Sequence, residues 1–196
     1  MSQKKLVNYL NKYQNEINIV GPLIKESITI KDPVIYIDGG TQFKTNQTGI
    51  SIGDGDSFEG ELDIKLSKEK NYSDLAYALG NIPSQYHKIN LHGFLGERRD
   101  HELINLAEVH SFLLNRTVPT KVSFDDSVIA YSTGSWELTI EDLFTLFSFE
   151  KNKINLSGKC KYPLNDHLKA LSSHGLSNIG SGKVSLKNES PIFLFF

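Results

Sequence analysis

Short apolar runs, each followed by a polar turn that contains glycine, recur through the first half of the chain and constrain its fold more than any other feature. Val34–Ile37 leads into Asp38-Gly39-Gly40, Ile50–Ile52 into a Gly-Asp turn, and Ile89–Leu91 into a glycine and arginine cluster. Such short, continuous apolar runs are typical of buried parallel strands. Ligands bind at the carboxyl ends of such strands in an open α/β sheet, so we expect the functional site in these turns.

Helices are expected between the strands. The helical spacing of apolar residues predicts a first helix over 4–17. Ser73 is a suitable N-cap for a helix over 74–80, and residues 101–115 have the apolar content of a longer helix. After Pro119 the pattern changes to short alternating segments separated by glycine and serine, which predicts antiparallel strands.

Two domains are therefore predicted. Residues 1–118 are expected to form a three-layer α/β/α nucleotide domain with a mostly parallel sheet. Residues 119–196 are expected to form an antiparallel β-sandwich.

Charge and composition limit the partners. The 196 residues include 21 basic and 23 acidic side chains, a net charge of -2, which gives no electrostatic footprint for nucleic acid or an anionic membrane. No apolar stretch approaches the roughly 20 residues that span a bilayer, and no apolar segment follows the basic start as in a signal peptide. With one cysteine, Cys160, no intrachain disulfide can form. We expect a cytoplasmic protein that binds neither nucleic acid nor membrane but can hold a small polyanion such as ATP.

Two carboxylates lie one residue apart in the turn after Ile50–Ile52. Asp54 and Asp56 offer the oxygen ligands that Mg²⁺ prefers, and the glycines around them let the backbone approach a phosphate. The same residues are equally typical of a surface Asx turn. Asp38-Gly39-Gly40 could hold a nucleotide ribose or phosphate, or be a simple strand-ending turn.

A second polar cluster precedes the predicted long helix. Arg98 could clamp phosphates with its planar guanidinium, and Asp100 could complete a metal site or orient the nucleophile. The alternative is a solvated charge run that caps the helix, although Gly93 and Gly96 favour a functional role. Asp74 could be a third metal ligand or only part of a helix cap.

The order of the motifs is more specific than any one of them. Along the chain they are Asp38-Gly39-Gly40, Gly53-Asp54-Gly55-Asp56-Ser57, Ser73-Asp74, Gly96-x-Arg98-x-Asp100-His101 with Asn105, Tyr162-Pro163-Leu164 and Ser177-Asn178. This series resembles thiamine pyrophosphokinase over roughly residues 17–196. The resemblance implies an N-terminal α/β nucleotide domain, a C-terminal β-sandwich and a homodimer.

The resemblance also implies a reaction and a set of site residues. The alcohol of thiamine would attack the β-phosphorus of Mg-ATP, giving thiamine diphosphate and AMP. The implied magnesium ligands are Asp54, Asp56, Asn71 and Asp74. The implied catalytic residues are Asp54, Asp56, Asp74, Arg98 and Asp100. The implied nucleotide-binding residues are Asp38, Gly39, Gly40, Arg98, His101 and Asn105. Thiamine would face Ser177 and Asn178 in a pocket made across the dimer.

The chain departs from the family pattern at three places. The family's Lys-Asp-x-Thr-Asp motif is Lys70-Asn71-Tyr72-Ser73-Asp74 here, so position 71 keeps an oxygen ligand but loses a charge, and we expect weaker magnesium binding. Glu97 replaces the glycine before the arginine and brings a negative side chain near the phosphates. The segment between Gly21-Pro22 and Asp38 is short for the helix that the family usually has there.

Two alternatives stay open. One is a pyrophosphokinase for another hydroxymethyl heterocycle, such as a pterin. The other is a non-catalytic protein that binds thiamine or a nucleotide on the same scaffold. The retained acids favour an enzyme, and the Tyr162-Pro163-Leu164 and Ser177-Asn178 motifs favour thiamine.

Overall fold

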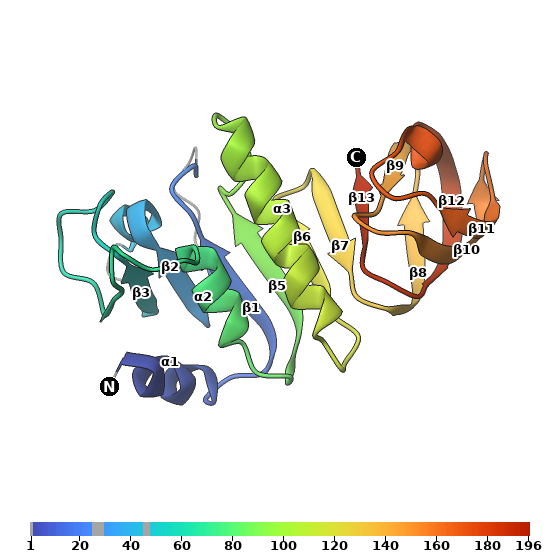
Figure 1. Cartoon of the computed structure of the whole chain (residues 1–196). Helices are drawn as coiled ribbons and strands as arrows, with labels where there is room; N and C mark the ends of the chain where they lie inside the picture. The colour runs from blue at the N-terminus through green and yellow to red at the C-terminus, as the bar shows by residue number, and fades with distance from the viewer. Residues whose placement is uncertain (1, 25–29, 45–47) are drawn as a thin grey trace. The chain divides into compact units, whose positions relative to one another are not determined.

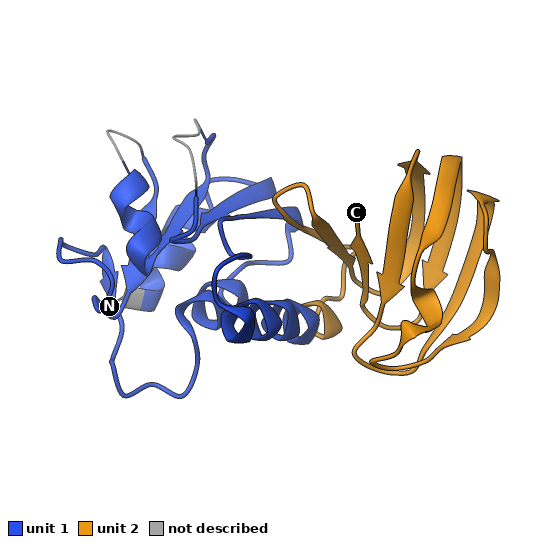
Figure 2. Ribbon diagram, turned by 90° about the horizontal axis from the view of Figure 1, so that it is seen from above, with its two compact units in different colours: residues 1–112 blue, residues 113–196 orange. Residues whose placement is uncertain are grey.

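The computed structural model describes residues 2–24, 30–44 and 48–196. The chain divides into two compact units, Met1–Phe112 (unit 1) and Leu113–Phe196 (unit 2), which Figure 2 shows in different colours. In the described part of the chain no helix is both long and apolar enough to cross a membrane.

Unit 1 is built on parallel strands (Figure 1). The strands are β1 (Asn15–Val20), β2 (Val34–Ile37), β3 (Ile50–Gly53), β4 (Ile64–Lys65) and β5 (Tyr86–His92). They pair in the order β5-β1-β2-β3-β4, and every pair is parallel. All residues of β2 and β3 are buried, as expected for parallel strands whose two faces are covered.

Three α-helices are present among the described residues: α1 (Ser2–Leu10), α2 (Asp74–Gly80) and α3 (Arg99–Leu114). A 3-10 helix, η1 (Asp38–Phe43), follows β2 directly. The predicted N-cap of α2 is confirmed, because the Ser73 side chain accepts a hydrogen bond from the Ala76 amide at 3.0 Å. The prediction of one helix over 4–17 is wrong beyond Leu10: a turn follows at residues 11–12, and β1 starts at Asn15, whose φ of +72° is not helical.

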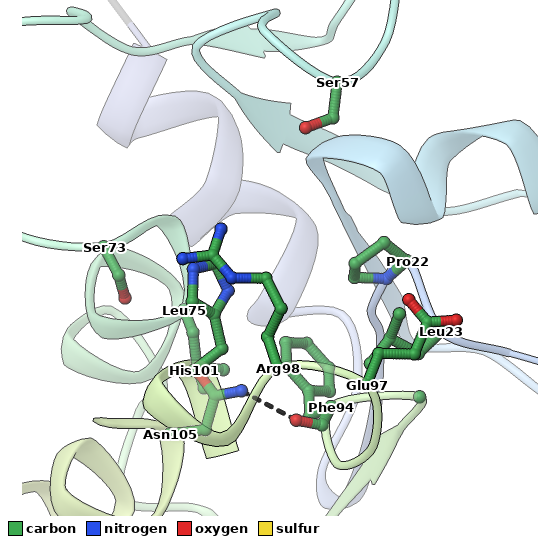
Figure 3. Close-up of a pocket in the computed structure, with 11 residues that line it drawn as sticks. Pro22, Leu23, Ser57, Ser73, Leu75, Phe94, Glu97, Arg98, His101 and Asn105 are labelled. Atoms are coloured by element: carbon green, nitrogen blue, oxygen red, sulfur yellow. Dashed lines mark hydrogen bonds between the residues drawn. The ribbon is translucent and has the colours of Figure 1, made fainter. Parts of the chain in front are cut away.

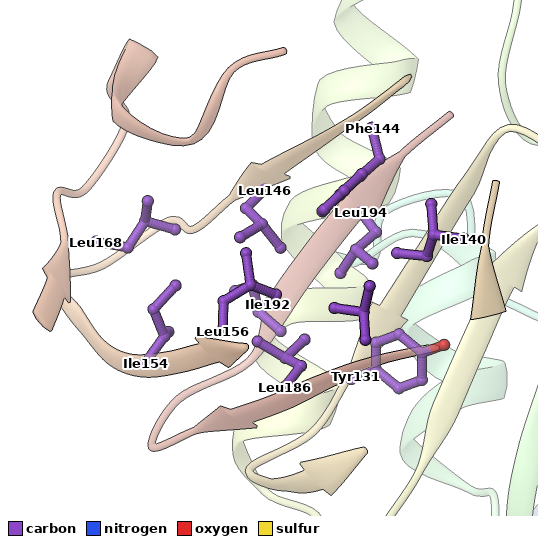
Figure 4. Packing of buried hydrophobic residues seen from close by; sticks show 11 residues of the cluster. Tyr131, Ile140, Phe144, Leu146, Ile154, Leu156, Leu168, Leu186, Ile192 and Leu194 are labelled. Carbon is purple, nitrogen blue, oxygen red and sulfur yellow. The ribbon is translucent and has the colours of Figure 1, made fainter. Parts of the chain in front are cut away.

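Unit 2 is antiparallel throughout. Its strands are β6 (Lys121–Phe124), β7 (Val128–Tyr131), β8 (Gly134–Ile140), β9 (Leu143–Phe147), β10 (Asn152–Cys160), β11 (Leu164–Leu168), β12 (Asn178–Asn188) and β13 (Ile192–Phe195), with a 3-10 turn, η2 (Ser173–Gly175). Their order is β11-β10-β12-β9-β13-β7-β6, and β8 also pairs with β12. Figure 4 shows the apolar core that these strands enclose, in which Phe144, Leu156 and Leu194 are almost fully buried.

The predicted fold class, a three-layer α/β/α domain followed by a separate β-sandwich, is wrong. The described part of the chain is mostly β, with thirteen strands in a mixed sheet and few helices. In unit 2, β12 pairs with β8 over Gly182–Asn188 and with β9 over Asn178–Ile179, so one long strand links pairs that a sandwich would keep in two sheets. In unit 1, the described residues between β1 and β2, 21–24 and 30–33, contain no helix that could form a layer.

Asp63 joins three elements of unit 1 and should contribute strongly to its stability. Its carboxylate contacts Lys5 of α1 at 2.8 Å and Lys44 at 2.6 Å, and it accepts hydrogen bonds from the amide and hydroxyl of Ser51 in β3, both at 3.0 Å. Burial alone would raise the pKa of Asp63, but the bonds from Lys44, Lys5 and Ser51 outweigh burial and hold it far below its usual range. The ionised carboxylate is therefore the form that stabilises the fold.

We expect Asp63→Asn to lower the free energy of unfolding by about 2 kcal/mol at neutral pH, because charge-assisted hydrogen bonds are lost. A folded-state pKa below the unfolded value gives stabilisation that is present above about pH 4 and is lost as the pH falls through the folded-state pKa. Urea unfolding of both proteins should therefore give curves that converge in acid. Asp126→Asn, at an exposed turn, is the control; an equal loss in it would contradict this role of Asp63.

Candidate functional site

The turns after two neighbouring parallel strands bring three aspartates together. Asp38 follows β2, and Asp54 and Asp56 follow β3. Each of the three offers a carboxylate oxygen, and these oxygens all lie within 4.8 Å of one another. Gly53 permits the approach, because a Cβ at this position would lie 2.7 Å from Oδ1 of Asp38. The three acids are called the acid group below.

The negative charge of the acid group is not fully compensated by neighbouring cations or by bound protons. Oδ1 of Asp38 is buried without a hydrogen-bond partner. Burial and a hydrogen bond with Asp56 raise the pKa of Asp38 to about 6. The same bond, helped by the Ser57 hydroxyl, lowers the pKa of Asp56. A buried oxygen without a partner beside two further carboxylates is the donor set of a hard divalent cation, so these residues fit Mg²⁺.

A fourth acid, Asp74, lies at the start of α2 and is held by a lysine. Nζ of Lys70 lies 3.1 Å from Oδ1 of Asp74 and 2.5 Å from Oδ2 of Asp54. Burial raises the pKa of Asp74 although Lys70 opposes the shift. Ser73, the α2 N-cap, donates to Oε2 of Glu108 from α3 at 2.6 Å, so α3 fixes the end of α2 that carries Asp74.

A pocket of about 310 Å³ lies beside these aspartates, with Ser57 and Ser73, the neighbours of Asp56 and Asp74, in its lining (Figure 3). Its lining residues are Pro22, Leu23, Ser57, Ser73, Leu75, Gly93, Phe94, Glu97, Arg98, His101 and Asn105. Apolar side chains form part of the wall and hydrogen-bonding groups the rest, which is the usual composition of a small-molecule site. Asn105 donates to the Phe94 carbonyl at 2.8 Å and so closes the loop before α3.

The loop before α3 contributes two charged side chains to the pocket lining, Arg98 and Glu97. Arg98 forms a two-point ion pair with Asp100, at 2.5 and 3.2 Å, and both side chains are exposed. This pair raises the pKa of Arg98 and lowers that of Asp100. Glu97 has φ +58°, a left-handed conformation that favours glycine. The departure from the family pattern at position 97 thus combines an added charge with a strained backbone.

The other residues predicted for this site have different surroundings. Gly40 packs against β1, where a Cβ would lie 2.3 Å from the Val20 carbonyl oxygen, and Gly39 is buried in η1 beside it. His101 lines the pocket with Asn105. Asn71 is exposed. The structure therefore brings Asp38, Asp54, Asp56 and Asp74 into one region, with Arg98 and His101 at the adjoining pocket.

The residues predicted to face thiamine belong to unit 2. Asn178 is buried and locks the chain locally: Oδ1 accepts from the Tyr162 amide at 3.0 Å, and Nδ2 donates to the Tyr162 carbonyl at 2.7 Å. Ser177 is exposed and has φ +57°. The Tyr162-Pro163-Leu164 and Ser177-Asn178 motifs, distant in sequence, are thus joined by the Asn178 side chain.

Lys70 and Glu108 are the contributors that sequence reasoning did not assign. Lys70 stands four residues before Asp74, a spacing that brings the two charges together at a helix start. No pattern in the sequence connects Glu108 to Ser73, 35 residues earlier.

The fold is similar to those of solved thiamine pyrophosphokinases. The structure titled thiamine pyrophosphokinase from Bacillus subtilis has a TM-score of 0.68 and 20% identity, and the match covers 92% of this chain and 98% of that chain. The enzyme from Geobacillus thermodenitrificans gives 0.67 and 19%, covering 91% and 95%. The enzyme from Candida albicans gives 0.69 and 11%, covering 95% and 89%.

No family model matches the chain, and no curated protein matches it by sequence. The similarity to solved structures is therefore one of fold. It confirms, at that level, the resemblance to thiamine pyrophosphokinase that the order of motifs predicts.

Proposed function

We propose that this chain is a thiamine pyrophosphokinase, which transfers a pyrophosphoryl group from Mg-ATP to thiamine and releases AMP. The observation that carries the proposal is the acid group at the ends of β2 and β3, next to a pocket lined by Arg98. A cation site beside a guanidinium suits a bound triphosphate, because a metal ion and a guanidinium are both positively charged and both bind negatively charged phosphate oxygens. The fold of the solved thiamine pyrophosphokinases supports the choice of reaction.

In the proposed reaction, the hydroxyl oxygen of thiamine forms a bond to the β-phosphorus of ATP, and the hydroxyl proton passes to solvent. The bond between that phosphorus and the oxygen bridging to the α-phosphate breaks, and the oxygen leaves with AMP. Asp38, Asp54 and Asp56 would hold Mg²⁺, which when bound neutralises charge on the phosphate oxygens. Arg98 would grip the phosphates, with Asp100 orienting its guanidinium before the nucleotide arrives.

AMP release with Mg-ATP and each of three acceptor conditions would test the proposal: thiamine, a hydroxymethylpterin, and no acceptor. We expect AMP only with thiamine, together with a product of the mass of thiamine diphosphate. If AMP forms only with the pterin, the proposed reaction stands but the acceptor is a pterin instead of thiamine. No AMP in any condition would contradict an enzymatic role, and calorimetry with thiamine would then test for a binding protein.

We also propose a homodimer in which thiamine binds at the Ser177-Asn178 motif of unit 2, as the resemblance implies, with exposed Ser177 facing it and buried Asn178 holding the segment through its bonds to Tyr162. Exposed apolar side chains surround these residues: Leu143 and Ile179 are directly opposite in the β9–β12 register, and Leu176 precedes Ser177. Apolar side chains in such a group favour burial against another surface. Light scattering should give about twice the chain mass; a monomer at assay concentration would contradict this part.

Substitutions at Glu97 should separate the effects of its charge and its backbone. We expect Glu97→Gln to lower the KM for Mg-ATP by about five-fold, because a like charge near the phosphates is removed. Glu97→Gly should do the same and also raise the free energy of unfolding by about 1 kcal/mol, since φ +58° suits glycine. Steady-state kinetics and urea unfolding measure the two effects. A raised KM in Glu97→Gln would show that the carboxylate assists binding.

A further inference from the structure

Lys70 is a buried cation between two carboxylates from different segments. Its side chain is 8% exposed, and those of Asp54 and Asp74 are 14% and 12% exposed. Its Nζ lies 2.5 Å from Asp54 and 3.1 Å from Asp74, so one ammonium bridges the turn after β3 and the start of α2. An unpaired charge at such depth would be costly, whereas a charge between two carboxylates is compensated.

The four acids of this region fall into two overlapping sets, of which one contacts Lys70. Among the described residues, Asp38, Asp54 and Asp56 form the group whose oxygens lie within 4.8 Å of one another, and Asp74 stands outside it. Asp74 instead contacts Lys70. Asp54 belongs to both sets: Oδ2 contacts Lys70, and Oδ1 accepts from the Asp56 amide at 3.2 Å.

We infer that Lys70 is a built-in counter-cation that occupies the place of a second divalent ion, so that the site binds one metal ion at the acid group. Lys70 pairs with Asp74 and Asp54, and Oδ1 of Asp38 is buried without a hydrogen-bond partner. Oδ1 of Asp74 also accepts no hydrogen bond and meets Lys70 as an ion pair at 3.1 Å. Lys70 acts through the carboxylates and is thus a positioning residue. The biological purpose of Lys70 rests on the proposed Mg-ATP chemistry, whereas the titration that tests its role does not depend on that chemistry.

A fixed positive charge next to the acid group also lowers its affinity for a free ion. Two like charges a few ångströms apart repel each other, and burial reduces the screening between them. The ion would therefore bind weakly alone and firmly when a polyphosphate adds negative charge. This arrangement favours the metal–nucleotide complex over the metal by itself.

Mn²⁺ titration without nucleotide tests the inference, with free Mn²⁺ followed by electron paramagnetic resonance. We expect the unmodified chain to bind one ion, and Lys70→Met to bind the first ion about ten-fold more tightly and to accept a second. Lys12→Met removes the same charge from an exposed side chain that precedes the amino end of β1 and should change the affinity by less than about two-fold. Lys70→Arg keeps the charge and should retain single-ion binding, which provides a test if the methionine variant does not fold.

Unchanged or weaker Mn²⁺ binding in Lys70→Met would overturn the inference, as would two ions in the unmodified chain or a second ion in Lys70→Arg. The titration uses neither thiamine nor ATP. If AMP release fails while the titration gives the expected result, the proposed reaction is wrong and the role of Lys70 stands. If AMP is released but the titration gives the opposite result, the proposed function stands and the role of Lys70 is wrong.

Discussion

Asp54→Asn is expected to reduce AMP release by about a thousand-fold while the chain stays folded, because one of three carboxylates that would hold the metal is lost. Asparagine keeps the size of the side chain and one oxygen but removes the negative charge. Asp54 repels Asp56 and Asp38 but also pairs with Lys70, so its loss relieves repulsion and removes one ion pair, while Lys70 keeps Asp74 as a partner. Steady-state AMP release and urea unfolding measured on the same preparation would show both effects.

Glu59→Gln is the matched control for Asp54→Asn. Glu59 is an exposed acid five residues along the same segment and stands outside the acid group. Its loss should leave turnover within about two-fold of the unmodified chain, because an exposed charge is screened by solvent. Undiminished turnover in Asp54→Asn, or an equal loss in Glu59→Gln, would remove Asp54 from the metal site.

Arg98→Lys is expected to lower kcat/KM for Mg-ATP by about a hundred-fold, because lysine keeps the charge but lacks the planar fork that binds two phosphate oxygens. The ion pair between Arg98 and Asp100 is exposed, so its loss should change stability little. Arg99→Lys is the matched control: the Arg99 side chain is 92% exposed and pairs with Glu102. Equal kinetic losses in the two variants would show that position 98 has no special role.

The parallel strands could be predicted from the sequence because their signal is local. Val34–Ile37 and Ile50–Ile52 are continuous apolar runs, and both form buried strands paired in parallel. The end of the first helix could not be predicted from apolar spacing, since Tyr13 and Ile17 continue the apolar pattern while the chain leaves the helix after Leu10. The predicted fold class, a three-layer α/β/α domain followed by a β-sandwich, failed because the pairing of β12 with both β8 and β9 is a long-range property that no short pattern records.

The candidate site was partly visible in the sequence. Asp54 and Asp56 lie in one recognisable turn, whereas Asp38 reaches them only because β2 and β3 are neighbours in the sheet. The four-residue spacing of Lys70 and Asp74 is compatible with an ion pair, but it does not show that the lysine is buried or that Asp74 stays outside the acid group. Ion pairs between segments depend on tertiary structure, so the sequence alone could not show which acids pair with Lys70.

The central claim, transfer of an intact pyrophosphoryl group, is tested most directly by ³¹P NMR of a reaction that contains Mg-ATP, thiamine and this chain. The account predicts that the ATP signals are replaced by those of AMP and of the two phosphates of thiamine diphosphate, in equal amounts. ADP with a phosphate monoester, or ADP with free phosphate, would show an ordinary kinase or an ATPase and would contradict the account.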